Sequence, residues 1–178
     1  NGYQRYDHAG VSPMPIPGGP GSYVANGSEH DGIGDTTHLA ERHVQMTHRR
    51  WNKLKLLEDG DFEADLIDSP IAIVPWGGSK GPAREAYDKL IESGVKIAWL
   101  YTMFINPLPP EMLDNLRNKE LVLVPELNYQ GQFSMILRSL GVKALSITQY
   151  TGLPFKVKDL VESINEQIEI YEQGQAKI

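Results

Sequence analysis

The chain has 178 residues and a formal net charge of −6, so it offers no excess of positive charge to hold a nucleic-acid backbone. It contains no cysteine, which excludes disulfides, thiolate metal sites and iron–sulfur ligation by these residues. Hydrophobic residues make up 40% of it, enough for a core, yet no apolar run approaches the roughly 20 residues of a membrane span. We therefore expect a soluble, cytoplasmic protein that binds neither nucleic acid nor membrane. Because the sequence begins with Asn1, we interpret it as part of a longer polypeptide.

The first 68 residues predict an arm, a helix and a linker. Residues 10–34 hold four Pro and seven Gly, too many backbone breakers for regular structure, which predicts an extended, irregular arm. Residues from about 39 to 58 have helical periodicity, with five cations among the other positions. The apolar face of this predicted helix consists of Val44, Thr47, Trp51, Leu54 and Leu57. The acidic residues 61–68 are most simply a solvated linker.

From residue 69 onward the pattern becomes regular. Four apolar runs alternate with four helical patterns, and the runs are "PIAIVPW", "VKIAWLYTMF", "ELVLVPE" and "VKALSITQY". Continuous apolar strands are typical of a sheet buried on both faces, and alternation with helices indicates right-handed parallel crossovers. Residues 69–178 are therefore predicted to form an α/β domain, a three-layer sandwich around a mainly parallel sheet.

Ligands of such sheets bind outside the carboxyl ends of the strands, so the loop "PWGGSKG" is the first candidate site. Ser79 and Lys80 precede a predicted helix, where free N–H groups and the helix dipole favour an anion. The order of residues is not that of a Walker loop. The plainer interpretation, a turn that needs glycine, is favoured over a phosphate site, but Lys80 keeps the phosphate hypothesis open.

The second candidate is the polar segment in "LVLVPELNYQGQF", where Glu126, Asn128 and Gln132 follow a buried strand. A buried carboxylate has to be paired or hydrogen-bonded, and the two amides can close a polar network around it. In a purely structural role, the segment caps a helix that begins near Gln130. In a functional role, it forms the wall of a cleft. We favour the structural role.

No metal site or catalytic residue is predicted. The histidines lack the spacing of a metal site, and they are His8, His30, His38, His43 and His48. The alternating acids from Asp59 to Asp65 imitate a calcium loop, but Ala64 and Pro70 stand where glycine and a bidentate glutamate belong. No Gly-x-Ser-x-Gly elbow occurs either.

Four motifs, in chain order, carry a resemblance to a known family. They are "YQRYDHAGVSPMPIPG", "SEHDGIGD", "HRRWNKLKLLE" and "VPELNYQGQF". Together they resemble successive motifs of the alpha subunit of 2-oxoacid:ferredoxin oxidoreductases, in particular the 2-oxoglutarate type within the pyruvate:ferredoxin oxidoreductase superfamily. The resemblance implies that residues 1–60 are the end of a pyrimidine-binding domain. It also implies that residues 69–178 are similar to the transketolase C-terminal domain.

The resemblance further implies an activity for the complete enzyme: oxidative decarboxylation of a 2-oxoacid on thiamine diphosphate and Mg²⁺, transfer of electrons through a [4Fe–4S] cluster to ferredoxin, and release of an acyl-CoA. The implied partners are a beta subunit, with gamma and delta subunits as further candidates, and coenzyme A, for whose phosphates Ser79 and Lys80 are the candidate contact. This segment has no Gly-Asp-Gly run and no Cys, so we expect it to hold no cofactor and to be inactive alone.

The motif "DHAGVSPM" departs from the family pattern, with Ala9 in place of Asp and Met14 in place of Arg. The family's catalytic glutamate and its substrate-facing threonine and arginine are expected upstream of Asn1. Which 2-oxoacid is used therefore stays open. Two alternatives also stay open, namely the C-terminal assembly domain of a transketolase or a 2-oxoacid dehydrogenase E1 component, and a free-standing anion-binding α/β module. The motifs "SEHD" and "NYQGQF" argue against the transketolase alternative.

Overall fold

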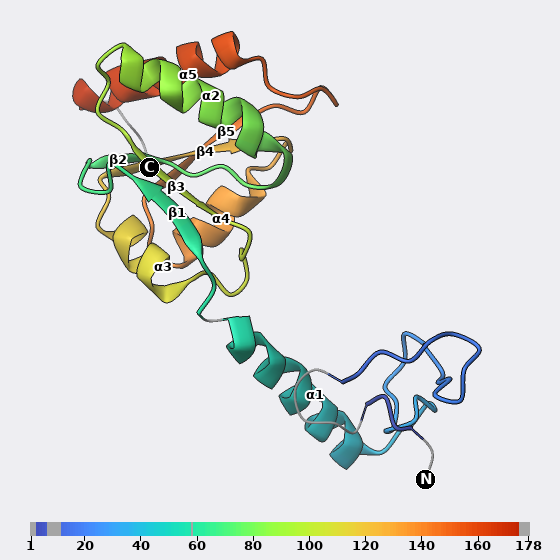
Figure 1. Ribbon diagram of the computed structural model, residues 1–178. Helices are drawn as coiled ribbons and strands as arrows, with labels where there is room; N and C mark the ends of the chain where they lie inside the picture. The colour runs from blue at the N-terminus through green and yellow to red at the C-terminus, as the bar shows by residue number, and fades with distance from the viewer. Residues whose placement is uncertain (1–2, 7–11, 58, 175–178) are drawn as a thin grey trace. The chain divides into compact units, whose positions relative to one another are not determined.

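The chain divides into two compact units, Asn1–Glu58 and Asp59–Ile178. The computed structural model describes residues 3–6, 12–57 and 59–174 (Figure 1). Ala9, one of the two departures from the family pattern, lies outside the described residues.

A five-stranded sheet with the strand order β1-β3-β2-β4-β5 organises the second unit. The strands are β1 (Phe62–Asp65), β2 (Ile71–Ile73), β3 (Ala98–Thr102), β4 (Leu121–Glu126) and β5 (Ala144–Thr148). The last four run parallel to one another, and β1 pairs antiparallel with β3. The predicted mainly parallel sheet is therefore confirmed.

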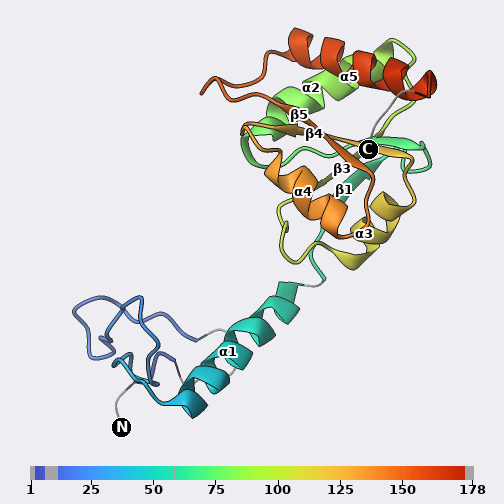
Figure 2. The ribbon, with the colours of Figure 1, turned by 180° about the vertical axis from the view of Figure 1, so that it is seen from behind.

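Helices cover both faces of this sheet (Figures 1 and 2). They are α2 (Lys80–Glu92) and α5 (Val157–Glu172) on one face, and α3 (Pro110–Arg117) and α4 (Gln132–Ser139) on the other. The three-layer sandwich predicted from the alternation of strands and helices is confirmed.

Two hydrophobic cores result, because successive residues of a strand point to opposite faces of the sheet. On β4, Leu121 and Leu123 pack toward α2 and α5, whereas Val122 and Val124 pack toward α3 and α4. All four side chains are fully buried. Burial on both faces explains why the central strands read as continuous apolar runs.

The acidic segment 61–68 differs from its prediction. It contains β1, so the interpretation as a solvated linker is wrong for residues 62–65. The acids are compatible with a strand because β1 lies at the edge of the sheet, where Glu63 and Asp65 remain exposed and Phe62 is half-buried. The Thr102 hydroxyl at the end of β3 donates to the carbonyl of Asp61 at 2.9 Å, which helps to fix the start of the strand.

The first unit contains the predicted helix, α1 (Ala40–Leu54), which continues as a 3₁₀ turn over Lys55–Leu57. The predicted apolar face is largely uncovered, since Val44 and Trp51 are 53% and 64% exposed while Met46 is buried. The described part of the arm, residues 12–34, has no helix and no strand beyond an isolated bridge between His30 and Thr36, as its Pro and Gly content predicts.

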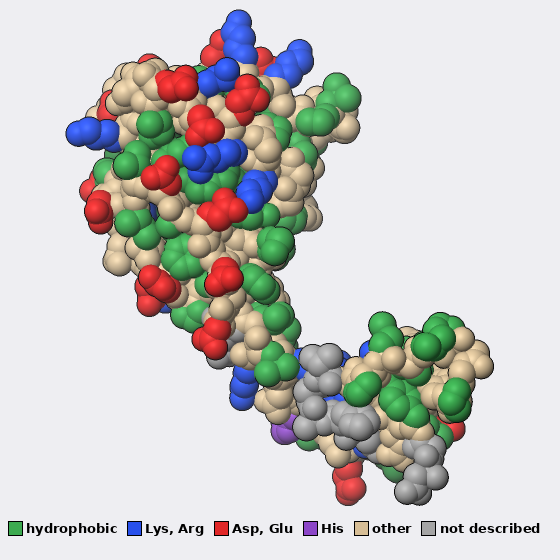
Figure 3. Space-filling view, in the orientation of Figure 1, with side chains coloured by type: hydrophobic (Ala, Val, Ile, Leu, Met, Phe, Trp, Pro, Cys, Tyr) green, Lys and Arg blue, Asp and Glu red, His purple; other side chains and the backbone are tan. Residues whose placement is uncertain are grey.

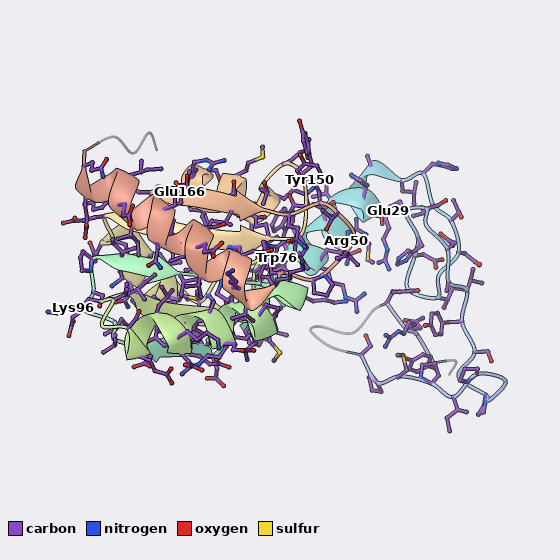
Figure 4. The ribbon with its side chains drawn as sticks, turned by 90° about the horizontal axis from the view of Figure 1, so that it is seen from above. Glu29, Arg50, Trp76, Lys96, Tyr150 and Glu166 are labelled. Atoms are coloured by element: carbon purple, nitrogen blue, oxygen red, sulfur yellow. The ribbon has the colours of Figure 1, made fainter. Side chains whose placement is uncertain are left out.

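Arginines of α1 bind the arm and the segment before it. Arg49 donates to the carbonyl of Tyr6 and to the hydroxyl of Ser12, the latter at 3.1 Å. Arg50 donates to both carboxylate oxygens of Glu29, at 3.3 and 2.8 Å, and the two side chains point toward each other in Figure 4. The arm is thus held against α1 by charged hydrogen bonds to a carboxylate, a hydroxyl and backbone carbonyls.

Among the described helices, none is both long and apolar enough to cross a membrane.

Candidate functional site

The carboxyl ends of β2 and β4 form the natural place for a site. These strands are neighbours, yet the chain leaves β2 for α2 on one face of the sheet and leaves β4 for α4 on the other. Such a divergence opens a crevice between the two loops. Trp76, which follows β2, and Tyr150, which follows β5, lie at this end of the sheet, whereas Lys96, which precedes β3, lies at the opposite end (Figure 4).

A cleft of about 270 Å³ occupies this crevice. Its lining comes from the loops after both strands and comprises Trp76, Gly77, Gly78, Ser79, Leu127, Asn128 and Gln132. The structure therefore brings together three of the five residues proposed from the sequence, since Ser79 lies on one wall and Asn128 and Gln132 on the other. Lys80 and Glu126 do not line the cleft.

The first wall is a tight turn closed by Ser79. Its hydroxyl accepts the N–H of Trp76 at 3.1 Å and donates to the carbonyl of Trp76 at 2.8 Å. The side chain is buried and both of its hydrogen bonds stay within the turn, so its role is to shape the wall. Gly77 has a φ of 53°, a left-handed conformation that favours glycine at this position.

Trp76 supplies the apolar surface of the same wall. Its ring packs against Phe133 on α4, with ring centroids 5.9 Å apart, and so joins the two loops. The indole Nε1 is buried and donates to no acceptor among the described residues. Neither Trp76 nor Leu127 on the opposite wall was singled out from the sequence. The signal for Trp76 is its position directly before the glycine pair.

Glu126 anchors the second wall. Its side chain is completely buried, and its oxygens accept the backbone N–H groups of Phe133 and Ser134 at 2.8 and 2.9 Å, and the Ser134 hydroxyl at 2.6 Å. A fourth bond comes from Asn128 Nδ2 at 3.0 Å. The carboxylate thus satisfies donors in the first turn of α4, where the helix dipole favours negative charge.

Asn128 completes the cap of α4. Its Oδ1 accepts the N–H groups of Gly131 and Gln132 at 2.8 and 3.2 Å, while its Nδ2 donates to Glu126. The polar network expected at the end of this strand is therefore present, and it caps the helix that begins at Gln132. Gly131 has a φ of 67°, and a Cβ built there would lie 2.6 Å from Ser146 Oγ. Only glycine fits this turn without displacing β5.

Gln132 differs from the other two residues of this network. Its backbone N–H is bound by Asn128, but its exposed side chain forms no hydrogen bond with any described residue and faces the cleft. A side-chain amide offers both a donor and an acceptor. Gln132 is therefore the polar side chain of the cleft that is most accessible to a ligand.

Lys80 lies on the other side of its loop from the cleft. Its Nζ is 2.6 Å from Glu63 Oε1 on β1 and 3.9 Å from the centre of the Tyr101 ring. Glu63 also accepts from Trp99 Nε1 at 3.3 Å, and the hydrogen bond from Lys80 is the main cause that lowers the pKa of Glu63. Glu63 was missed because β1 was not predicted. A contact between Lys80 and a coenzyme A phosphate stays a prediction, and such a phosphate has to compete with Glu63 for the ammonium.

Two other buried titratable groups lie outside the cleft. Burial raises the pKa of the Tyr87 phenol, which packs against Trp99 beneath α2. Burial lowers the pKa of Lys119, whose ammonium donates to the carbonyls of Ile67 and Ser69 and thereby fixes the connection between β1 and β2. In the part of the chain that the structure describes, no cluster of three His, Asp or Glu side chains could hold a metal ion.

No family model matches the chain, but individual proteins do. It is 31% identical over 150 residues to the 2-oxoglutarate oxidoreductase subunit KorA of Mycobacterium tuberculosis, covering 82% of this chain and 23% of that protein. It is 29% identical over 163 residues to the alpha subunit of 2-oxoacid:ferredoxin oxidoreductase 1 of Aeropyrum pernix, covering 85% of this chain and 25% of that protein. The chain thus spans about a quarter of the length of the curated relatives it matches.

A solved structure is similar over nearly the whole chain. It is the 2-oxoglutarate:ferredoxin oxidoreductase from Magnetococcus marinus with 2-oxoglutarate, coenzyme A and succinyl-CoA bound. The TM-score is 0.73 and the sequence identity 30%, over 93% of this chain and 31% of that one. Likeness in sequence and in structure therefore leads to the same group of proteins.

Proposed function

We propose a function from one premise: this chain is a homologue of the alpha subunits of 2-oxoacid:ferredoxin oxidoreductases. The family recognised from the four sequence motifs is confirmed. The transketolase or E1 domain and the free-standing anion-binding module are not favoured, because the similar proteins are oxidoreductase subunits over most of this chain.

The proposed complete enzyme converts a 2-oxoacid, coenzyme A and oxidised ferredoxin into an acyl-CoA, CO₂ and reduced ferredoxin. The bond to the carboxylate breaks and releases CO₂, the acyl carbon forms a bond to the coenzyme A sulfur as the thiol proton is released, and the electron pair passes to oxidised ferredoxin. In this proposal thiamine diphosphate, Mg²⁺ and a [4Fe–4S] cluster are bound by other segments or by the beta subunit. The residues present here do not fit those groups, since the sequence has no Cys and no Gly-Asp-Gly run.

This segment then serves assembly and the shaping of the active site. Residues 1–60 are proposed as the end of the pyrimidine-binding domain, and residues 69–178 as the domain similar to the transketolase C-terminal domain. The observation that carries the role is the carboxyl edge of the sheet, where Leu127 lines the cleft and the rings of Tyr129 and Tyr150, from the loops after β4 and β5, pack on each other, all three side chains being exposed. Exposed aromatic residues around a cleft are typical of contact surfaces.

An activity comparison tests this proposal. The complete alpha subunit, coexpressed with its beta subunit, is assayed with 2-oxoglutarate, coenzyme A, thiamine diphosphate, Mg²⁺ and a viologen acceptor, and the 178-residue chain is assayed alone under the same conditions. We expect turnover that depends on a 2-oxoacid and coenzyme A from the complete enzyme, and none from the chain alone. Turnover by the isolated chain, or a complete enzyme without 2-oxoacid oxidation, contradicts the proposal.

A further inference from the structure

The loop "ANGSEHDGIG" in the first unit holds a side chain that can react with the backbone beside it. Asn26 is followed by Gly27, and both residues are exposed. In an Asn-Gly pair the backbone nitrogen of the glycine can attack the side-chain amide, because the second residue has no Cβ to obstruct the approach. Asn1–Gly2 is the other such pair in the sequence, and it lies outside the described residues.

The Asn26 side chain is held at both ends in one orientation. Its Oδ1 accepts the N–H of Ser28 at 2.8 Å, and its Nδ2 donates to the carbonyl of Gly34 at 2.8 Å. Exchanging the oxygen and nitrogen of the amide would break both bonds. The bond from Ser28 forms an Asx turn, which folds the carboxamide back over the peptide that follows it. The amide carbon Cγ therefore lies on the same side of the chain as the Gly27 nitrogen.

The bond from Ser28 also favours the chemistry. When a nitrogen attacks an amide carbon, negative charge develops on the amide oxygen, and a hydrogen-bond donor aimed at that oxygen stabilises it. The attacking N–H of Gly27 donates to no acceptor among the residues that the structure describes. Beyond its chain neighbours, no heavy atom lies within 4 Å of the place where a Gly27 Cβ would stand. The nucleophile is thus neither engaged by a hydrogen bond nor shielded by packing.

Two other asparagines of the described residues lack one part of this arrangement. Asn128 Oδ1 also accepts backbone N–H groups, and its Nδ2 also has an acceptor, Glu126. It is followed by Tyr129, however, whose side chain crowds the attacking nitrogen. Asn52 lies inside α1, where the backbone N–H groups are committed to the hydrogen bonds of the helix. Asn26 combines a polarised amide with an unhindered glycine nitrogen.

We propose that Asn26 is a site of spontaneous deamidation, at which the protein acquires an aspartate or an isoaspartate. The Gly27 nitrogen gives up its proton to the solvent and forms a bond to Asn26 Cγ, and the bond from Cγ to Nδ2 breaks as ammonia leaves with a proton from the solvent. Water then opens the resulting succinimide, so that one water is consumed and one ammonia is released. Opening at Cγ gives aspartate, and opening at the main-chain carbonyl carbon gives isoaspartate.

The modification removes a bond that closes the loop. A carboxylate at position 26 can still accept the N–H of Ser28, but it has no donor for the Gly34 carbonyl. It also adds negative charge to a segment that already carries three acids, namely Glu29, Asp31 and Asp35. The segment from residue 26 to residue 34 therefore loosens when the asparagine is converted.

Peptide mapping by mass spectrometry of the complete enzyme, incubated at neutral pH, tests the proposed site. We expect Asn26 to be converted at least as fast as in a synthetic peptide of residues 22–30, with both aspartate and isoaspartate formed, while Asn128 and Asn52 stay unmodified. Conversion more than about tenfold slower than in the peptide overturns the proposal, because the two hydrogen bonds of the amide then protect it.

Gly27→Ala tests the attacking group. Gly27 has no left-handed φ and its Cβ position is open, so the fold tolerates alanine there. We expect the variant to convert Asn26 about tenfold more slowly, a change of ~1.4 kcal/mol in the barrier, because the methyl group obstructs the approach of the nitrogen. A rate that Gly27→Ala leaves unchanged overturns the proposed chemistry, since water then attacks the amide directly.

Amide hydrogen exchange tests the consequence for the loop. Asn26→Asp is expected to exchange faster than the wild type at Gly34 and Thr37, whose N–H groups are bonded to Asp31 and Glu29 within this segment. Asn52→Asp, exposed on α1, makes the same change of charge and is the matched control, with exchange at these two sites expected to be unchanged. Equal exchange in Asn26→Asp and the wild type contradicts the loosening. None of these measurements depends on 2-oxoacid oxidation, so their failure leaves the proposed function untouched.

Discussion

Lys80 and Glu63 join helix α2 to the edge strand β1 through an ion pair with an Nζ–Oε1 distance of 2.6 Å. Trp99 on β3 donates to the other oxygen of the same carboxylate at 3.3 Å. One exposed glutamate therefore links three elements and adds to the backbone pairing that holds this short acidic segment on β3. The lysine that the sequence presents as a phosphate ligand is engaged in this link.

The first prediction separates the two roles of Lys80. In the complete enzyme, Lys80→Ala and Glu63→Gln are compared for their KM for coenzyme A. If Lys80 contacts a phosphate, the first variant raises this KM and the second, which frees the lysine, lowers it. Because the geometry places the ammonium on Glu63, we expect both variants to leave the KM within about twofold of the wild type, a change smaller than the loss of one charged hydrogen bond produces. The cost in stability is expected to be small, at most about 0.5 kcal/mol, because the pair is solvent-exposed.

The second prediction concerns Glu126. Glu126→Ala leaves several donors at the start of α4 unsatisfied, and we expect it to lower the free energy of unfolding of the chain by about 2–4 kcal/mol. Glu126→Gln retains the shape of the side chain but places an amino group, which cannot accept a hydrogen bond, toward the donors at the start of α4. We therefore expect a loss of unfolding free energy smaller than that of Glu126→Ala. Urea unfolding followed by circular dichroism measures both. Glu166→Ala, exposed on α5 in Figure 4, is the control, and an equal effect at the two glutamates contradicts the capping role.

The third prediction concerns the turn at Gly131. Gly131→Ala introduces both a strained φ of 67° and a Cβ that meets Ser146, whereas Gly141→Ala introduces strain at a φ of 86° with no atom within 4 Å of the new Cβ. We expect about 1–2 kcal/mol of destabilisation for Gly141→Ala and clearly more for Gly131→Ala. Part of the difference should be recovered when Ser146→Gly removes the contacting atoms. Thermal melts of Gly131→Ala, Gly141→Ala, Ser146→Gly and the double variant Gly131→Ala/Ser146→Gly decide the point, since equal losses at both glycines leave no role for the contact.

The fourth prediction is a pH dependence of the first unit. The hydrogen bond from Arg50, with smaller contributions from His30 and His43, lowers the pKa of Glu29 to about 2 from a usual value of 4.5. A depressed carboxylate pKa stabilises the folded arm fully above pH 4.5, and this stabilisation is lost as the pH falls toward 2. Amide hydrogen exchange at Thr37, whose N–H is bonded to the Glu29 carbonyl, is expected to accelerate over that range.

Arg50→Gln provides the matched test of that dependence. It removes the main cause of the shift, so the pKa of Glu29 measured by NMR should move back toward 4.5 and the acid-induced loosening should begin at a higher pH. Glu41→Gln, exposed on the same helix, should leave the titration of Glu29 as it is. A pKa of Glu29 that is insensitive to Arg50→Gln contradicts the assigned cause.

The fifth prediction is that the arm is a contact surface of the complete enzyme. Ser12 is buried by its bonds to α1, while Met14 and Ile16 beyond it are 77% and 81% exposed. A proline-rich segment loses little backbone entropy when its apolar side chains bind a surface. Limited proteolysis between Ser12 and Pro20 should be fast in the isolated chain and slow in the complete enzyme, and equal rates in both count against the contact.

The parallel core was predictable from sequence because burial on both faces leaves continuous apolar runs such as Leu121–Val124. The edge strand β1 was not, because "FEAD" alternates with acids that only an exposed, antiparallel edge tolerates, and its pairing with β3 is a long-range contact. Acidic and basic side chains are also interspersed over the rest of the surface of the α/β domain (Figure 3). No local pattern distinguishes an edge strand of this kind from a linker.

The candidate site was predictable in its parts but not in its assembly. Loops after strands are recognisable from glycine and polar residues, and Ser79, Asn128 and Gln132 were found in that way. That the loops after β2 and β4 share a cleft depends on the strand order, in which β3 and β4 flank β2. The partner of Lys80 depends on it as well, since Glu63 reaches the lysine only because β1 lies beside β3.

The divergence of α2 and α4 means that the two walls of the cleft continue into helices on opposite faces of the sheet, although the Trp76 ring of the first wall packs on the core beneath α4. The turn at Trp76–Ser79 continues into a helix packed with α5, whereas the segment from Leu127 to Gln132 continues into a helix packed with α3. Substitutions in the core beneath α4 should therefore shift both walls, whereas substitutions between α2 and α5 act on the first wall alone. Selection, or a protein engineer, can thus adjust the first wall from the α2 side while the second keeps its shape.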